Sequence, residues 1–180
     1  MVWNWKYALV VVVFIALSGC SKQERETFDI FFYSELSSQL QEDTKELVFD
    51  SVHGLGEEDV QLFFHPTVLE KMIVDIVAHE GDVFVVDQAL INAAFDEEGL
   101  IPLDGIIDEA DLESIPTQYK SENDETGDVH VHVLPLDNDS LLLRHLQVEV
   151  EEQLLAFVPI YSDNQEQALQ FLQHVSKREE

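Results

Sequence analysis

Short, almost continuously apolar runs, separated by segments with helical spacing, are the feature that most constrains the fold of this chain. They lie at residues 28–35, 59–65, 82–87 and 154–159. Strands that are buried on both faces of a sheet have this pattern. Strands that alternate with amphipathic helices form parallel sheets with right-handed crossovers. The sequence therefore predicts an α/β fold, a single-domain open, mostly parallel sheet with helices on both faces.

Segments with helical spacing connect these runs. Helices are predicted at residues 37–53, 66–79, 88–95, 141–146 and 164–175. The second of them starts with a proline, which suits a first helical turn. It also has a wide apolar stripe, and such a stripe normally faces the core. The stripe consists of Val68, Leu69, Met72, Ile73, Ile76 and Val77.

The middle of the chain is less regular. Residues 108–128 are acidic and rich in turn-forming residues, which predicts a surface loop or a short helix. Residues 129–133 alternate between valine and histidine, so a fourth strand is expected over residues 129–135. On that strand His130 and His132 share one face.

The N-terminus has the three parts of a secretory signal. Lys6 precedes an apolar run at residues 8–16, which is shorter than the roughly 20 residues that span a bilayer. The sequence Leu-Ser-Gly-Cys at residues 17–20 follows and resembles the bacterial lipobox. The resemblance implies cleavage before Cys20 and a diacylglyceryl thioether on its sulfur, with fatty acids such as palmitate. The alternative is an ordinary signal peptide with a stray cysteine.

Cys20 is also the only cysteine of the chain. It has no intramolecular disulfide partner, so lipidation is the simpler explanation for a cysteine in an extracytoplasmic protein. The chain then divides into a signal peptide (1–19), the lipidated cysteine with a polar tether (20–27), an α/β domain (28–176) and a charged tail (177–180). The expected location is the outer face of the bacterial cytoplasmic membrane.

The chain is strongly acidic. After cleavage before Cys20 it has eight basic and 37 acidic residues, a net charge of −29 with neutral histidines. This charge excludes general nucleic-acid binding. It also repels an anionic membrane surface, so the lipid must hold the protein there. The carboxylates are scattered, which favours solubility in saline or alkaline surroundings over a cation-binding role.

Part of the chain resembles a known family. Within residues 69–104, the stretches Gly-Asp-Val-Phe-Val-Val-Asp (81–87) and Gly-Leu-Ile-Pro-Leu-Asp (99–104) are similar to the first lobe of extracellular solute-binding lipoproteins of ABC importers. Residues 157–172 are similar to that family's closing segment. A family member closes its solute between two lobes. Here about 25 residues separate Asp104 from Val129, so a second lobe is absent.

Three side chains are candidates for ligand contacts. Ligands of open α/β sheets gather at the carboxyl ends of the strands. Ser34, His65 and Asp87 lie at such ends. The alternative for each is a helix cap or a turn, which serine and aspartate commonly form.

His130 and His132 are candidate metal ligands because they lie two residues apart on a predicted strand. A metal site needs three or four ligands, and the chain has no established metal-binding signature. A solvated sheet face is the alternative.

The sequence thus predicts a non-catalytic accessory component of solute uptake, for instance of carbohydrates, that contacts an ABC permease or a full-size solute-binding protein. No cofactor is expected, because the chain has no phosphate-binding or dinucleotide-binding glycine motif. A direct binder of a small solute or cation, acting as a dimer that rebuilds the cleft, is the alternative. An enzyme of the cell envelope is a third hypothesis.

Overall fold

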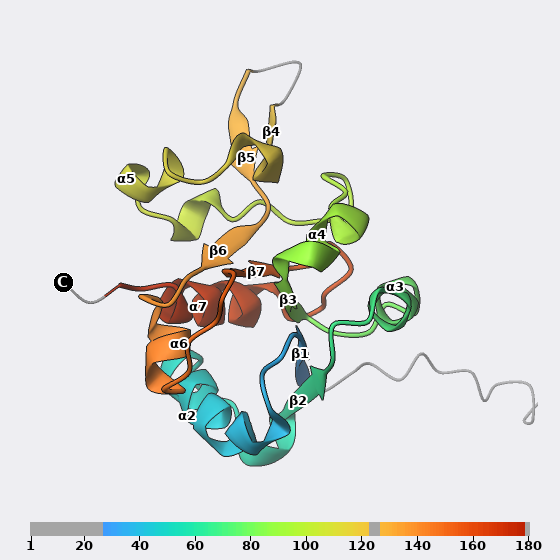
Figure 1. Ribbon diagram of the computed structural model, residues 1–180, viewed down its shortest axis with the longest axis vertical. Helices are drawn as coiled ribbons and strands as arrows, with labels where there is room; N and C mark the ends of the chain where they lie inside the picture. Colours follow the sequence, from blue (N-terminus) through green and yellow to red (C-terminus); the bar gives the residue numbers. More distant parts are fainter. Residues whose placement is uncertain (1–26, 123–126, 179–180) are drawn as a thin grey trace, which may run out of the picture.

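A five-stranded sheet forms the centre of the protein (Figure 1). The computed structural model describes residues 27–122 and 127–178. The strand order is β2-β1-β3-β7-β6. The strands are β1 (Phe28–Tyr33), β2 (Val60–His65), β3 (Val83–Asp87), β6 (Leu134–Leu136) and β7 (Leu154–Phe157).

The sheet confirms the predicted α/β class and adds the direction of one strand. β1 pairs in parallel with both β2 and β3, whereas β7 runs antiparallel to β3 and β6. Phe157, the last residue of β7, consequently pairs with Phe84 near the start of β3. The chain that follows β7 therefore emerges at the amino ends of the parallel strands.

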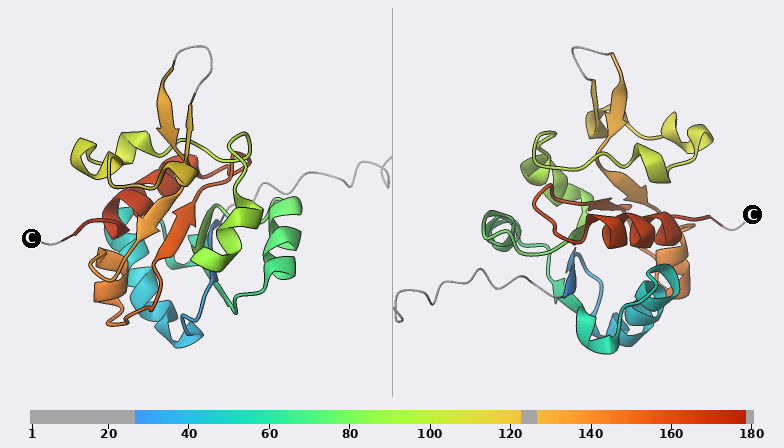
Figure 2. Two further views of the ribbon diagram at one scale, coloured as in Figure 1. Left: turned by 45° about the horizontal axis from the view of Figure 1, so that its top comes forward. Right: turned by 180° about the vertical axis from the view of Figure 1, so that it is seen from behind.

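Alternating side chains of each strand divide the core into two layers, one on each face of the sheet. Phe28, Ile30 and Phe32 point to one face, and Phe31 and Tyr33 point to the other. The first face is covered by α2 (Gln41–Ser51), α6 (Leu141–His145) and α7 (Gln165–Val175). The second is covered by α3 (Leu69–Val77), α4 (Gln88–Ala94) and part of the middle segment. Figure 2 shows helices on both sides, as the sequence predicts.

The middle of the chain is more ordered than the sequence predicts. After the short helix α5 (Glu109–Leu112), strand β4 (Lys120–Glu122) pairs antiparallel with β5 (Val129–Val131). The resulting hairpin projects from the sheet at the top of Figure 1. The single strand predicted at residues 129–135 was therefore wrong. It is two strands in two sheets, since β5 belongs to the hairpin and β6 to the central sheet.

The remaining short elements are single 3₁₀ turns. They lie at Ser38–Leu40, Glu57–Asp59, Asp104–Ile106 and Thr117–Tyr119. The described part of the chain has no helix that is both long enough and apolar enough to cross a membrane. The signal peptide and Cys20 lie outside the described residues.

Candidate functional site

Helix α3 turns most of its apolar side chains toward solvent. Val74 and Val77 are 60% and 74% exposed, and Leu69 and Ile73 are exposed as well. Met72 and Asp75 are the buried residues of this helix. The expectation that the whole apolar stripe packs on the core was therefore wrong. Asp75 turns inward beside Met72, and the buried hydroxyl of Tyr33 donates a hydrogen bond to it.

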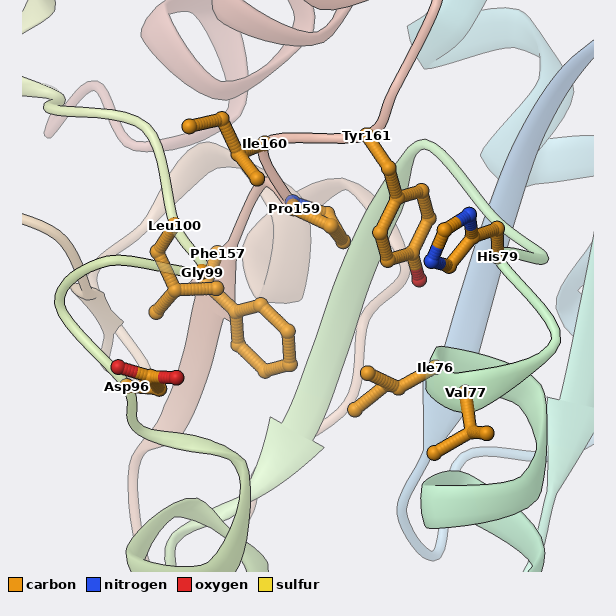
Figure 3. A pocket seen from close by; sticks show the side chains of 10 residues that line it. All are labelled: Ile76, Val77, His79, Asp96, Gly99, Leu100, Phe157, Pro159, Ile160 and Tyr161. Atoms are coloured by element: carbon orange, nitrogen blue, oxygen red, sulfur yellow. The ribbon is translucent and has the colours of Figure 1, made fainter.

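A pocket with a volume of about 480 Å³ adjoins the end of this helix (Figure 3). This volume lies within the range of about 300–1,000 Å³ that is usual for ligand pockets. One wall is the end of α3, and the other consists of two extended segments. These segments are held together by hydrogen bonds from Ile160 N to the Gly99 carbonyl (2.9 Å) and from Ile101 N to the Val158 carbonyl (3.0 Å). The lining is Ile76, Val77, His79, Asp96, Gly99, Leu100, Phe157, Pro159, Ile160 and Tyr161.

An aromatic pair closes one side of the pocket. The rings of His79 and Tyr161 stack with centroids 4.6 Å apart and an interplanar angle of 13°. The Tyr161 hydroxyl donates to the Glu80 carbonyl at 2.9 Å. Figure 3 shows this pair on one side and the Asp96 carboxylate on the opposite side. The contact between these rings links the end of α3 to the segment that follows β7.

A buried carboxylate, Asp82, holds the segment after β7 to the start of the domain. Its Oδ2 accepts from Asp29 N at 2.9 Å and from Asn164 Nδ2 at 3.1 Å, and its Oδ1 accepts from the Ser162 hydroxyl at 2.8 Å. Asn164 Nδ2 also donates to the Thr27 carbonyl at 3.0 Å. The Asp82 cluster therefore places the pocket beside the point where the chain enters the domain.

The same region has a tight backbone turn at Gly81. This residue has φ +79°, a conformation that favours glycine. A Cβ atom there would lie 2.7 Å from Cδ2 of Phe31, too close for any side chain. The turn lets the chain pass from α3 into β3 directly beneath the aromatic core.

Carboxylates surround the pocket and the outer face of α3. Three segments form the pocket and the outer face of α3, namely residues 69–80, 95–100 and 157–163. Together they carry seven aspartates or glutamates and one lysine. That lysine, Lys71, is held by both carboxylate oxygens of Asp75 at 2.5 Å. The exposed acidic side chains around the apolar surface include Glu70, Asp96, Glu97, Glu98 and Asp163. The surface is therefore apolar at its centre and negative at its margin.

The structure places Ser34, His65 and Asp87 at the carboxyl ends of strands, as the sequence predicts. Ser34 and His65 are in contact, and Asp87 lies at the end of β3. Ser34 N donates to the His65 carbonyl at 3.1 Å, and the Ser34 hydroxyl accepts from Leu36 N at 3.3 Å. Asp87 accepts a hydrogen bond from the Thr67 hydroxyl. The polar groups of Ser34 and Asp87 thus bond to neighbouring turns. The pocket lies at the other end of the sheet, at the amino ends of the parallel strands.

Sequence reasoning missed the buried polar group at the edge where Ser34 and His65 meet. Tyr33 is fully buried, and its hydroxyl meets Asp75 of α3, 42 residues away. Burial raises the pKa of Tyr33 well above its usual value, and the bond to Asp75 raises it further. Tyr33 is therefore a permanent hydrogen-bond donor. No local pattern could have paired it with a helix residue so distant in sequence.

His65 packs against aromatic rings at the same edge. Its ring centroid lies 5.0 Å from that of Tyr33 and 5.9 Å from that of Phe31. Its Nε2 atom is buried without a hydrogen-bond partner in the described part of the chain. Burial lowers the pKa of His65 and Lys71 lowers it further, whereas Asp75 acts in the opposite direction. The folded protein therefore favours the neutral ring.

This environment predicts a loss of stability on acidification. The unfolded chain takes up the proton near the ordinary pKa of 6.5, before the folded protein does. The contribution of His65 is therefore complete above about pH 6.5 and is lost as the pH falls toward the lower folded pKa. We expect the His65→Phe variant to lose less stability than the native chain between pH 7.5 and 5.5, as measured by urea unfolding.

The exposed His53 is the control for this experiment. His53→Gln removes a histidine from the surface just after α2 and is measured over the same pH range. An equal effect of the two substitutions would show that burial of His65 is not the cause.

His130 and His132 form hydrogen bonds with different residues. His130 Nδ1 lies 2.7 Å from the Asp104 carboxylate, which also accepts from Val131 N at 2.5 Å. His132 is buried just after β5, and its Nε2 lies 2.8 Å from the Ser121 hydroxyl. Among the residues that the structure describes, no group of three or more histidine, cysteine or acidic side chains is placed to hold a metal ion. A metal role for the two histidines stays a prediction.

Comparisons with known proteins give one relevant likeness. The chain is 26% identical over 168 residues to the protein named "Putative lipoprotein YteS" of Bacillus subtilis (strain 168), and the alignment covers 93% of each chain. No protein-family model and no solved structure matches. The likeness supports a lipoprotein and covers nearly the whole length of both chains. It carries no support for the family of solute-binding proteins.

Proposed function

We propose that this chain is a non-catalytic lipoprotein on the outer face of the cytoplasmic membrane, where its domain serves solute import by contacting a transport protein. The partner is an ABC permease or a full-size solute-binding protein. The observation that carries the proposal is the exposed apolar face of α3, which continues into the pocket. Exposed apolar surfaces with a polar margin mark sites of interaction.

The sequence supports the anchor. The lipobox at residues 17–20 directly follows the apolar run of the signal peptide. The similarity of the chain to a protein named as a lipoprotein extends over 93% of its length. Two acyl chains on Cys20 would hold the domain at the membrane despite its negative charge. A protein fixed in this way meets other membrane proteins by diffusion within the same bilayer.

The role in import is supported by the position of the residues that resemble the first lobe of solute-binding proteins. Residues 69–104 include α3, whose end is one wall of the pocket, and Asp96, Gly99 and Leu100, which belong to the other wall. A single lobe cannot enclose a solute on both sides. The α3 face and the pocket would then serve contact with another protein.

The non-catalytic assignment is supported by the environment of the candidate polar residues. The Ser34 hydroxyl accepts from the backbone of Leu36, Asp87 accepts from Thr67, and His130 lies against Asp104. Each of these three side chains is thus hydrogen-bonded to another group of the domain. The pocket is instead lined mainly by apolar side chains.

In-cell photocrosslinking tests the proposal. A photoreactive amino acid in place of Val77 should yield an adduct with a transport protein, identified by mass spectrometry. Glu42, an exposed residue of α2 on the opposite side of the sheet, is the matched control and should yield no such adduct. Absence of transport components from the Val77 adducts, or equal capture from both positions, would contradict the proposed function.

The volume of the pocket favours direct solute binding as a second candidate. A solute at about 100 times its dissociation constant stabilises a protein by roughly 2.7 kcal/mol. A panel of sugars, amino acids, peptides, phosphate, Ca²⁺ and Zn²⁺ should leave the melting temperature unchanged if the main proposal is right. A saturable shift that is lost in the Tyr161→Ala variant would favour the second candidate, because Tyr161 lines the pocket.

A further inference from the structure

We infer that the outer face of α3 and the pocket form one docking surface for an amphipathic helix that carries lysine or arginine beside its apolar row. The helix belongs to a protein of the same membrane. The inference rests on the proposed function and specifies the chemistry of the partner. It follows from the size of the surface, its charge and its position relative to the lipid anchor.

The size of the surface calls for a polypeptide. Leu69, Ile73 and Val77 are four residues apart and form one row along α3. The row extends over about 12 Å at a rise of 1.5 Å per residue, and it ends at the pocket. A small solute in the pocket would leave most of this row exposed. A partner helix packed against α3 would cover the row, and one apolar side chain of the partner would enter the pocket.

The charge of the surface selects a basic partner. Seven carboxylates and one lysine lie on the three segments that form the surface, and Lys71 is paired with Asp75. A second copy of this chain would bring two such acidic margins together, with a net charge of −29 on each mature chain. An anionic bilayer surface is repelled for the same reason. Basic side chains beside an apolar row complement this margin.

The tether of the mature chain cannot cover the surface itself. Residues 21–26 read Ser-Lys-Gln-Glu-Arg-Glu and have no large apolar side chain. Burial of the row on α3 requires apolar groups on the other side. The occupant is therefore a different chain.

The position of the surface indicates a partner in the same membrane. Asn164 binds the Thr27 carbonyl, and Tyr161, three residues earlier, lines the pocket. The eight residue steps from Cys20 to Phe28 span at most about 29 Å of extended chain. The start of the domain, and the docking surface beside it, thus stay within a short distance of the lipid headgroups.

Binding of two synthetic helices tests the inference. The first is an 18-residue peptide of leucine and lysine with its leucines on one face, and the second has glutamate at every lysine position. The protein is the complete mature chain, residues 20–180, made without lipid as Cys20→Ser. We expect the lysine peptide to bind, and the glutamate peptide to bind at least tenfold more weakly, in fluorescence anisotropy titrations.

Two neutral variants separate docking from general attraction to an acidic protein. The double variant Ile73→Gln/Val77→Gln should weaken binding of the lysine peptide at least tenfold without a change of charge. Val129→Gln is the matched control, since Val129 of β5 is 56% exposed and lies outside the docking surface. Equal binding by the double variant and the native chain, or equal binding of both peptides, would overturn the inference. Melting temperatures verify that all variants are folded.

The result separates this inference from the proposed function. If Val77 captures a transport protein in cells while the lysine peptide shows no specific binding, the partner chemistry is wrong and the proposed function stands. If the peptide binds as expected while Val77 captures no transport component, the docking surface stands and the role in import fails. Capture of a second copy of this chain, or of lipid alone, at Val77 would overturn the inference.

Discussion

Replacing Asp82 with alanine should lower the free energy of unfolding by about 3–5 kcal/mol. The substitution leaves three donors without their acceptor: Asp29 N, the Ser162 hydroxyl and Asn164 Nδ2. A buried donor that loses its partner costs about 1–3 kcal/mol, and a bond to a charged acceptor is worth more than a neutral one. This loss is a large part of the roughly 5–15 kcal/mol that stabilises a typical domain. Urea unfolding followed by circular dichroism measures it.

Two further variants show whether the hydrogen bonds are the cause. Asp59→Ala removes the same charge from a carboxylate that accepts from Gly56 N in an exposed turn, and it should cost less than about 1 kcal/mol. Asp82→Asn retains an acceptor for both N–H donors, and its amide can donate to the Ser162 oxygen. Asparagine should therefore cost less than alanine. Equal losses for Asp82→Ala and Asp59→Ala would contradict a structural role of the Asp82 cluster.

The central strands were predictable because burial on both faces leaves a local trace. Each residue of β1 is buried, and β3 is buried from Val83 to Val86. Such runs are apolar whichever elements cover them. The direction of a strand in the sheet leaves no such pattern in the local sequence. Leu154–Phe157 reads like any buried strand, and its antiparallel pairing with β3 depends on how the chain returns from β6.

The candidate site was not predictable, because long-range contacts create it. The apolar stripe of α3 correctly predicts a helix but predicts the wrong face for the core. Asp75 faces the core instead, where it accepts a hydrogen bond from Tyr33. The pocket combines residues 76–79, 96–100 and 157–161, which the reversed strand β7 brings together. The rule that ligands gather at the carboxyl ends of strands predicts a site at the opposite end of the sheet, at Ser34, His65 and Asp87.

Strand β4 illustrates a second limit of local patterns. The residues Lys120–Glu122 have no strand propensity and lie in an acidic segment. They form a strand because β5 supplies hydrogen-bond partners, with Lys120 opposite Val131.

Replacing Cys20 with alanine should abolish fatty-acid labelling of the protein in cells. The lipobox implies a thioether between the Cys20 sulfur and diacylglycerol, and alanine has no sulfur to carry it. Each buried methylene of an acyl chain contributes about 0.8 kcal/mol to membrane binding, so two chains give a stable anchor. Cells grown with a radiolabelled or alkyne-tagged palmitate should label the native protein. Mass spectrometry should find that the mature native chain begins at residue 20.

The substitution Ser18→Ala is the control from the same four residues. It leaves the cysteine and the leucine of the lipobox in place, so labelling and cleavage should continue. Labelling of the Cys20→Ala variant, or absence of label from the native chain, would show that Cys20 carries no lipid. The domain would then have no lipid anchor at Cys20, and its acidic surface would be repelled by an anionic bilayer. The docking surface would then not be held near the membrane by a lipid on Cys20.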